Sequence, residues 1–383
     1  DTDGDVGPNP YFQMINLSFA IYDKQGNKLY GPVDNSTLWN GFPGPWSGTN
    51  AGDPIILYAE MADRWMASQF AIYTSNNKYY ELVAVSETGD PLGAWYRYAF
   101  EFDLFPDYPK LSVWPDGYYA TFHMFSGNYA GMGVAVFERE KMLNGDPDAE
   151  MIYFGEYGSK FGFLPSDVDG DPPPAGTPNY ITGINFWGNK QMEIWELSAD
   201  WASPANSTFT LAESLTPATF NSNVSGIPQP GTGTGLASIS SVLMFRLPFR
   251  DFGSYKAMVA NHTVNAGGRA GIRWYELRDD GPGWTIYQQG TYSPDTENRW
   301  MGSIAMAENG NIALGYSVSS STVYPSIRYT GRTANAPPGE MNVQEIEVMA
   351  GASSQTNIER WGDYSCMSVD PASDTTFWFT TEY

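Results

Sequence analysis

The chain carries one short pattern twice, as DYPKLSVWPDGYYATF at residues 107–122 and as DYSCMSVDPASDTTFWF at residues 363–379. Both copies begin with Asp-Tyr, pass through Ser-Val to a turn containing Pro and Asp, and end in a run with aromatic residues. Aromatic and β-branched residues favour strands, whereas Pro and Asp favour turns. Each copy therefore predicts a strand, a tight turn and a second strand.

The same strand-turn-strand plan recurs in looser form at four other places. These are residues 53–70, 179–197, 243–264 and 299–318. The six units start roughly 55 to 70 residues apart, which leaves room for four strands and long loops in each unit. A repeat of this kind is typical of a β-propeller.

The two ends of the chain indicate how the ring would close. The last unit stops at Tyr383 after two strands, and residues 12–32 form a hairpin pattern without an inner partner. Pairing these ends removes the exposed edges of an open array of sheets. The sequence thus predicts an all-β, six-bladed propeller, with seven blades as the alternative. It would be a single domain over residues 1–383, closed by N-terminal strands that complete the C-terminal blade.

Charge and composition limit the partners. The chain has 43 acidic and 20 basic residues, a formal charge of -23, which disfavours nucleic acid because phosphates are bound by clustered Lys and Arg. No apolar run is long enough to span a bilayer. An acidic, Lys-poor chain that begins abruptly at Asp1 suggests a mature extracellular or cell-surface protein after removal of a signal peptide. The single Cys366 allows no intrachain disulfide.

Aspartates recur where the innermost strand of a unit is expected to begin. Asp53, Asp107, Asp167 and Asp363 would converge at one mouth of a propeller channel. Carboxylates that point at one axis repel each other unless a cation lies among them, which predicts Ca²⁺ or a cationic ligand. The alternative is that each Asp caps a turn or accepts hydrogen bonds from backbone N–H groups.

Two short acidic stretches resemble the opening of a calcium loop. They are Asp1-Thr-Asp-Gly-Asp5 and Asp167-Val-Asp-Gly-Asp171, and neither continues to the Glu that completes an EF-hand. The second stretch lies in a long loop that enters a unit. The predicted ligands of Ca²⁺ are Asp53, Asp107, Asp167, Asp169, Asp171 and Asp363.

Catalytic candidates are few. His123 and His262 are the only histidines, and both lie in predicted strands, where a packed histidine is the commoner role. With a Tyr and an Arg, either could serve a polysaccharide lyase, and a pair of the abundant carboxylates could serve a glycoside hydrolase. A Gly-X-Ser-X-Gly nucleophile motif is absent.

Aromatic residues in or near loops are candidates for stacking on sugar rings. The predicted ligand-binding residues are Trp46, Trp95, Trp187 and Trp284. Packing between blades would account for most of the other aromatic residues.

Several segments carry a resemblance to known proteins. GDVGPNPYFQMINLSFAIYDKQGNKLYGP, GDPIILYAEMADRWMASQF and RWGDYSCMSVDP resemble a large family of exported bacterial proteins that are usually left as hypothetical. The resemblance covers essentially the whole chain and implies export and a propeller fold, without an assigned activity. More distantly the chain is similar to sialidase-like propellers, but it lacks their Ser-X-Asp-X-Gly-X-X-Trp box, of which SETGDPLGAW is a loose echo.

These observations lead to one main functional hypothesis and two alternatives. The main one is a secreted or cell-surface, calcium-stabilised propeller that binds a glycan or an extracellular protein rather than acting as an enzyme. The first alternative is a carbohydrate-active enzyme, a polysaccharide lyase or glycoside hydrolase, that uses the channel mouth. The second is a structural subunit that self-assembles outside the cell.

Overall fold

The computed structural model describes residues 1–383, and nearly all of its regular structure is β-strand. The helical elements are short: α1 (Arg139–Leu143), η1 (Asn35–Trp39), η2 (Glu60–Ala62) and η3 (Pro204–Asn206). None of them is long and apolar enough to cross a membrane. The all-β prediction is therefore confirmed.

The strands form successive antiparallel meanders. The first three meanders are separate four-stranded sheets. Their strands are β1 (Thr2–Val6), β2 (Pro10–Ile15), β3 (Ser18–Asp23) and β4 (Lys28–Asp34); β5 (Ile55–Ala59), β6 (Arg64–Ala71), β7 (Tyr79–Ser86) and β8 (Trp95–Phe102); and β9 (Phe105–Trp114), β10 (Gly117–Ser126), β11 (Asn128–Phe137) and β12 (Met151–Tyr157).

The fourth and fifth meanders share one eight-stranded sheet, because β13 pairs in parallel with β17. A further four-stranded meander and a two-stranded hairpin follow. The strands are β13 (Leu164–Val168), β14 (Asn179–Ile184), β15 (Met192–Ser198) and β16 (Thr208–Leu215); β17 (Leu247–Asp251), β18 (Lys256–Asn265), β19 (Ala270–Asp279) and β20 (Trp284–Tyr292); β21 (Asn298–Met306), β22 (Ile312–Ser319), β23 (Ser326–Arg332) and β24 (Val343–Met349); and β25 (Cys366–Val369) and β26 (Phe377–Thr380).

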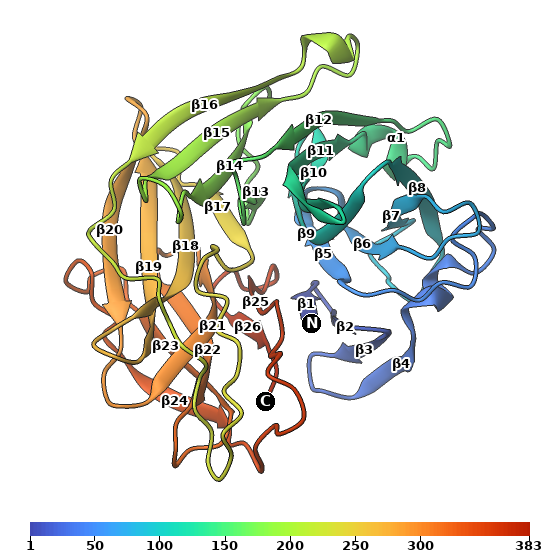
Figure 1. Ribbon diagram of the computed structural model, residues 1–383. Helices are drawn as coiled ribbons and strands as arrows, with labels where there is room; N and C mark the ends of the chain where they lie inside the picture. Colours follow the sequence, from blue (N-terminus) through green and yellow to red (C-terminus); the bar gives the residue numbers. More distant parts are fainter.

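The meanders are arranged around a common centre (Figure 1). The first strand of each contacts the first strand of the next, in the order β1, β5, β9, β13, β17, β21 and β25, and β25 contacts β1 again. Both chain ends lie near this centre (Figure 1). The arrangement is propeller-like.

The number of blades and the closure differ from the prediction of six blades with a shared last blade. Strands β1–β4 form a sheet of their own, and β25 and β26 pair only with each other. The ends meet through side chains instead: Tyr11 stacks on Trp378 at 5.2 Å, and Lys24 binds Asp370 at 2.7 Å. The prediction overlooked β1 because Asp and Gly are poor strand formers.

The third predicted unit, which corresponds to the fourth meander, is also shifted from its predicted position. Residues 179–197 form β14 and β15, whereas the innermost strand of this meander is β13. The stretch 163–178, expected as a loop, contains that strand. Its sequence LPSDV contains Pro and Asp, which have low strand propensity, so the residues themselves do not indicate a strand.

Aspartates on the first strands link neighbouring meanders. Asp3 Oδ2 accepts a hydrogen bond from Ile56 N at 2.8 Å, and Asp5 Oδ2 accepts one from Tyr58 N at 2.7 Å. A third link of this kind joins β13 to β9, where Val113 N donates to Asp167 Oδ1 at 2.7 Å. Buried carboxylates that accept backbone N–H bonds hold the first strands in place around the centre.

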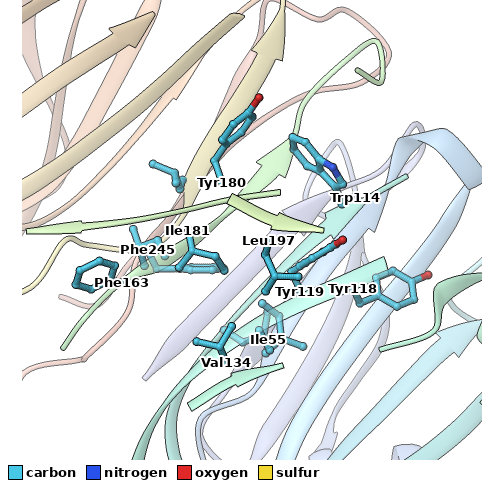
Figure 2. Packing of buried hydrophobic residues seen from close by; sticks show 14 of the residues in the cluster. Ile55, Trp114, Tyr118, Tyr119, Val134, Phe163, Tyr180, Ile181, Leu197 and Phe245 are labelled. Atoms are coloured by element: carbon cyan, nitrogen blue, oxygen red, sulfur yellow. The ribbon is translucent and has the colours of Figure 1, made fainter. Parts of the chain in front are cut away.

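Aromatic residues fill the spaces between sheets. The largest hydrophobic cluster contains 47 buried residues from β5 onward, several of which are drawn in Figure 2. Trp114 lies 4.8 Å from Phe249 and Tyr180 lies 4.9 Å from Trp284, both edge to face. Contacts of this geometry add to the stability gained from burial alone. Most of the aromatic content is thus structural.

Candidate functional site

Three acidic residues come together where the innermost strands begin. Asp53 immediately precedes Pro54 and β5, Asp107 lies at the start of β9, and Asp363 lies just before β25. Lys110 of β9 is buried beside them. With Tyr108 and Tyr364, these residues form what we call the mouth cluster: Asp53, Asp107, Tyr108, Lys110, Asp363 and Tyr364.

The two tyrosines bind the parts of the mouth cluster together. The Tyr364 hydroxyl donates to Pro109 O at 3.0 Å and lies 3.3 Å from Asp53 Oδ2. The Tyr108 hydroxyl donates to Asp363 O at 3.1 Å. Strands β5, β9 and β25, which are far apart in the sequence, are therefore joined at this end by side-chain hydrogen bonds.

Lys110 lies between the two tyrosine rings. Its Nζ is 3.2 Å from the centre of the Tyr108 ring and 3.4 Å from that of Tyr364, and the residue is 1% exposed. No carboxylate forms an ion pair with it, and its one hydrogen bond goes to Pro109 O at 3.4 Å. The ring faces attract the cation. Burial nevertheless lowers the pKa of Lys110 well below its usual range, against the opposing effect of Asp53 and Asp363.

The carboxyl groups of the mouth cluster have raised pKa values. Burial raises the pKa of Asp53 to about 6, the charge of Asp107 adds to this, and Lys110 opposes it. Burial also raises the pKa of Asp107 and of Asp363. A carboxyl group that titrates near 6 holds a proton for part of the time at neutral pH, which is what a general acid requires.

The backbone of the mouth cluster is strained. Asp53 and Tyr108 both have φ of 53°, in the left-handed region that side chains with a Cβ rarely adopt. Such conformations persist only where the surrounding structure imposes them, and they gather at functional sites. Here the strain places a carboxylate and a ring at the same mouth.

An aromatic rim lies next to the mouth cluster. We use this name for Trp187, Phe161 and Tyr129. The Trp187 side chain is 68% exposed and meets the Phe161 ring edge to face at 4.9 Å. Phe161 lies 5.2 Å from Tyr129 and stacks on His123 at 3.8 Å, and His123 lies 4.9 Å from Tyr108. The rim thus connects an exposed indole to the buried cluster.

One exposed cation stands at this mouth. The Arg360 side chain is 66% exposed, and its Nη2 lies 2.9 Å from Asp363 Oδ2. The Asp363 backbone N–H donates to Asp1 Oδ1 at 2.7 Å, so the N-terminal residue also contributes to the mouth. Asp107 and Asp363 are partly exposed, and they are the carboxylates that an incoming ligand would reach first.

Both histidines are packed. His123 Nε2 accepts a hydrogen bond from Gly162 N at 3.0 Å, and burial lowers the pKa of its ring to about 3. His262 lies 3.0 Å from the Tyr275 hydroxyl, among aromatic rings, and burial lowers its pKa to about 3 as well. His123 borders the mouth cluster, whereas the contacts of His262 belong to the core.

The remaining predicted calcium ligands lie elsewhere. Asp167 is inside β13 and not before it, and it is bound by Arg246 Nε at 2.6 Å. Asp169 is bound by the same guanidinium at 2.6 Å, and Asp171 is exposed. No three His, Cys, Asp or Glu side chains are grouped as a metal ion would require. Ca²⁺ binding stays a prediction, and Arg246 supplies the positive charge that was expected from an ion.

The four predicted ligand-binding tryptophans have different environments. Trp95 is 7% exposed and Trp284 is 3% exposed, so the expectation of exposed rings is wrong for both, and each belongs to a hydrophobic cluster. Trp46 is half-buried against Phe42 at 5.0 Å. Only Trp187 presents its ring to solvent.

Sequence reasoning did not single out Lys110, Tyr108 or Tyr364. The signal was present, because the repeat begins with Asp-Tyr in both of its clearest copies. The aspartates were interpreted as ligands, while the tyrosines that follow them were counted as packing. Their position directly after the acidic residue is what brings both hydroxyls to the mouth.

No protein-family model matches the sequence, and no curated protein matches it. Solved structures with a similar course of the chain include an α-L-arabinanase of Penicillium chrysogenum complexed with arabinobiose. It is 11% identical, with a TM-score of 0.43 over 87% of this chain and 92% of the other.

Two further structures are similar at the same level. A polysaccharide lyase of family PL25, an ulvan lyase, is 13% identical, with a TM-score of 0.43 over 87% of this chain and 83% of the other. A variant of the Synechocystis apocarotenoid oxygenase is 10% identical, with a TM-score of 0.49 over all of this chain and 74% of the other. A likeness at this level carries no information on activity.

Proposed function

We propose that this chain is a carbohydrate-active enzyme that hydrolyses a glycan at the mouth cluster. The observation that carries the proposal is the meeting of three carboxyl groups, one just before β5, one in β9 and one just before β25. Burial raises the pKa of one of them, Asp53, to about 6. Glycoside hydrolysis uses one carboxylic acid that holds a proton and a second carboxylate that is ionised.

Each group has a proposed role. Asp53 holds the proton for the leaving oxygen, because it is the most buried carboxyl group of the mouth cluster. Asp107 or Asp363, both more exposed, acts as the second carboxylate. Lys110 and the two tyrosines position these groups. Trp187 offers the flat apolar face on which a sugar ring stacks.

The charge at the mouth favours hydrolysis over a lyase reaction. A lyase acting on uronates has to neutralise the substrate carboxylate. The exposed cation at this mouth, Arg360, is already paired with Asp363, and three carboxylates would repel a uronate. The neutral His123 is also held by Gly162 N. A glycan without acidic groups is therefore the better substrate.

The test is a measurement of reducing ends released from a panel of neutral polysaccharides. Three single variants are compared with the unsubstituted protein: Asp53→Asn, Asp107→Asn and Asp363→Asn. We expect the two that replace the catalytic pair to lower the rate of hydrolysis by about 10²- to 10⁴-fold. The matched control is Asp280→Asn, which removes the same charge from an exposed residue on the β19–β20 turn. Full activity in all three variants would reject the mouth cluster as the catalytic site.

A glycan-binding module without turnover is the second candidate, and the exposure of Trp187 favours it. In that case the unsubstituted protein would bind a glycan, as measured by tryptophan fluorescence, without releasing reducing ends. The variant Trp187→Ala would lose this binding. The matched control is Trp46→Ala, whose ring is half-buried against Phe42. Equal loss of binding in both variants would speak against the aromatic rim.

We also propose that the propeller-like arrangement is a closed ring of seven units, with β25–β26 as a short last blade. Support comes from the ring of contacts between first strands and from the ion pair between Lys24 and Asp370 at 2.7 Å. We also keep two earlier hypotheses as part of the proposal, an extracellular or cell-surface location and stabilisation by Ca²⁺. The acidic composition of the chain supports both.

A further inference from the structure

A pocket lies at the opposite end of the first strands from the mouth cluster. It has a volume of about 470 Å³ and is lined by the turns that follow the first strands. Five inner hairpins contribute to it, those that follow β5, β13, β17, β21 and β25. We call it the hairpin pocket. Its acidic lining residues are Glu60, Asp169, Asp171, Asp251, Glu308 and Asp374.

The hairpin pocket carries negative charge that the protein does not neutralise. Arg250 is its only basic lining residue, and both ends of its guanidinium bind the carboxylate of Asp374. Glu60, Asp171, Asp251 and Glu308 form no ion pair. Like charges held close together disfavour the ionised state unless a cation joins them.

A buried atom without a partner points to a missing ligand. The Asp169 side chain is 4% exposed, and its Oδ1 is held by Arg246. Its Oδ2 is buried and has no hydrogen-bond partner, although the residue lines the hairpin pocket. A buried, unsatisfied carboxylate oxygen is costly, and a donor from a bound molecule would satisfy it.

The arrangement of the acidic side chains in the hairpin pocket fits an organic molecule with several positive charges better than a single metal ion. A bare Ca²⁺ ion gathers six to eight oxygens at about 2.3–2.6 Å. The acidic side chains are not grouped closely enough for three of them to share one ion. They are spread around a pocket of about 470 Å³, so a ligand that satisfies them needs several positive charges at separate positions.

We propose that the hairpin pocket binds a small organic polycation, with ammonium groups that bridge the carboxylates of neighbouring inner hairpins. A linear polyamine has this chemistry. The proposal is independent of the proposed function, because the pocket and the mouth cluster lie at opposite ends of the first strands.

Binding depends on pH through Glu60. Burial raises the pKa of Glu60 to about 8, the charges of Asp169 and Asp374 add to this, and Arg250 opposes it. Asp171, Asp251 and Glu308 line the same pocket. A bound cation favours the ionised carboxylate, so binding below pH 8 releases a proton. The affinity therefore rises by up to about tenfold per pH unit between pH 6 and 7.5.

The experiment is isothermal titration of the full chain with spermidine, at pH 6 and pH 7.5. We expect one saturable site, tighter binding at pH 7.5, and a proton release that is absent in Glu60→Gln. Glu308→Gln and Asp171→Asn, both at exposed positions and expected to fold, should weaken binding at least fivefold. Asp280→Asn, which removes the same charge away from the pocket, should leave binding within twofold.

Any one of four results would overturn the proposal. Equal weakening by Asp280→Asn, or binding without saturation, would mean diffuse attraction to a chain with a charge of -23. Failure of spermidine to bind while Ca²⁺ binds and is lost in Asp171→Asn would assign the pocket to a metal ion. If neither spermidine nor Ca²⁺ binds, solvent alone is enough to screen the carboxylates from one another. Loss of spermidine binding in Asp107→Asn would place the site at the mouth cluster instead.

Discussion

Arg246 sets the charge balance at the centre of the ring. It is 3% exposed, and its guanidinium holds both Asp167 and Asp169, with the charge of Asp5 also near. Removing one partner of a buried ion pair leaves the other charge uncompensated, at a cost of about 3–5 kcal/mol. We expect Arg246→Met to lower the free energy of unfolding by this amount, measured by urea denaturation.

Two controls distinguish lost charge from lost packing at this position. Arg246→Met combined with Asp167→Asn should recover part of the stability, because one buried charge is removed with its partner. Arg360→Met, at an exposed arginine, should stay within about 0.5 kcal/mol of the unsubstituted protein. A loss below about 1 kcal/mol in Arg246→Met would show that the carboxylates find other partners.

Glu81 shows the opposite case, a buried acid without a cation. The residue is fully buried in β7, and neither of its carboxyl oxygens has a hydrogen-bond partner. Burial raises its pKa well above the ordinary value of 4.5. The native state therefore keeps the proton while the unfolded chain loses it, and stability falls as pH rises above about 4.5.

Glu81→Gln removes this dependence, because the amide is neutral in both states. We expect the variant to gain stability relative to the unsubstituted protein, with a larger gain at pH 8 than at pH 5. Urea denaturation at both pH values measures the difference. A difference that is the same at pH 5 and pH 8 would mean that Glu81 ionises in the folded protein.

At the residue scale, sequence reasoning found the acidic residues of the candidate site but not their setting. The repeat placed Asp53, Asp107 and Asp363 at the starts of inner strands, and the structure brings them together. It could not reveal Lys110, because a lysine in a strand normally points to solvent. Two tyrosine rings from different strands create its buried environment, and only the assembled fold brings them together.

At the scale of single elements, the docking of the last hairpin depends on a glycine. A Cβ at Gly315 of β22 would lie 2.6 Å from the ring of Phe379 in β26. Overpacking of this kind costs about 1–3 kcal/mol. We expect Gly315→Ala to lower the melting temperature and to expose β25–β26 to limited proteolysis, because the hairpin has no other sheet to join.

The control for this substitution is Gly233→Ala, where a Cβ would meet no atom within 4 Å. It should melt within about 1 °C of the unsubstituted protein, since exposed changes away from contacts have small effects. If Gly315→Ala melts at the same temperature as this control, the hairpin does not rest on β22 in solution.

Element by element, the sequence predicts most of the inner hairpins and misses two of the inner strands. Units 53–70 and 107–122 correspond to β5–β6 and β9–β10, as predicted. The two inner strands that were overlooked, β1 and β13, have five residues each and contain aspartate. Their aspartates accept hydrogen bonds from the backbone of a neighbouring meander, a long-range contact that outweighs weak strand propensity and leaves no local signal.

For the whole molecule, the predicted number of blades depended on β1, because the meander of β13 was still counted through residues 179–197. The repeat correctly predicts a propeller-like chain, because hydrophobic alternation and turn residues recur along its length. Counting only the visible hairpins gave six units and assigned the N-terminal strands to the last one. The structure gives β1–β4 its own sheet, so the count changes although the architecture does not.

Buried acids also determine how the whole molecule responds to pH. Burial raises the pKa of Asp3 to about 6 and of Asp5 to about 7, from an ordinary value of 3.8. The same cause raises the pKa of Asp53 to about 6 and of Glu60 to about 8. Between about pH 4 and pH 8 these four acids therefore hold more protons in the folded protein than in the unfolded chain. The lowered pKa values of His123 and His262 offset part of this difference below about pH 6.5.

A state that binds more protons is favoured as pH falls, so stability should be greater near pH 5 than near pH 8. The growing negative charge of the chain acts in the same direction. We expect the midpoint of urea denaturation to fall steadily from pH 5 to pH 8. The fall should be smaller in Glu60→Gln, because Glu60 has the highest pKa of these four acids. Added salt screens the exposed charges but leaves the buried groups unaffected. A fall that disappears in 0.5 M NaCl would assign the effect to surface repulsion, and a maximum at pH 8 would contradict the raised pKa values altogether.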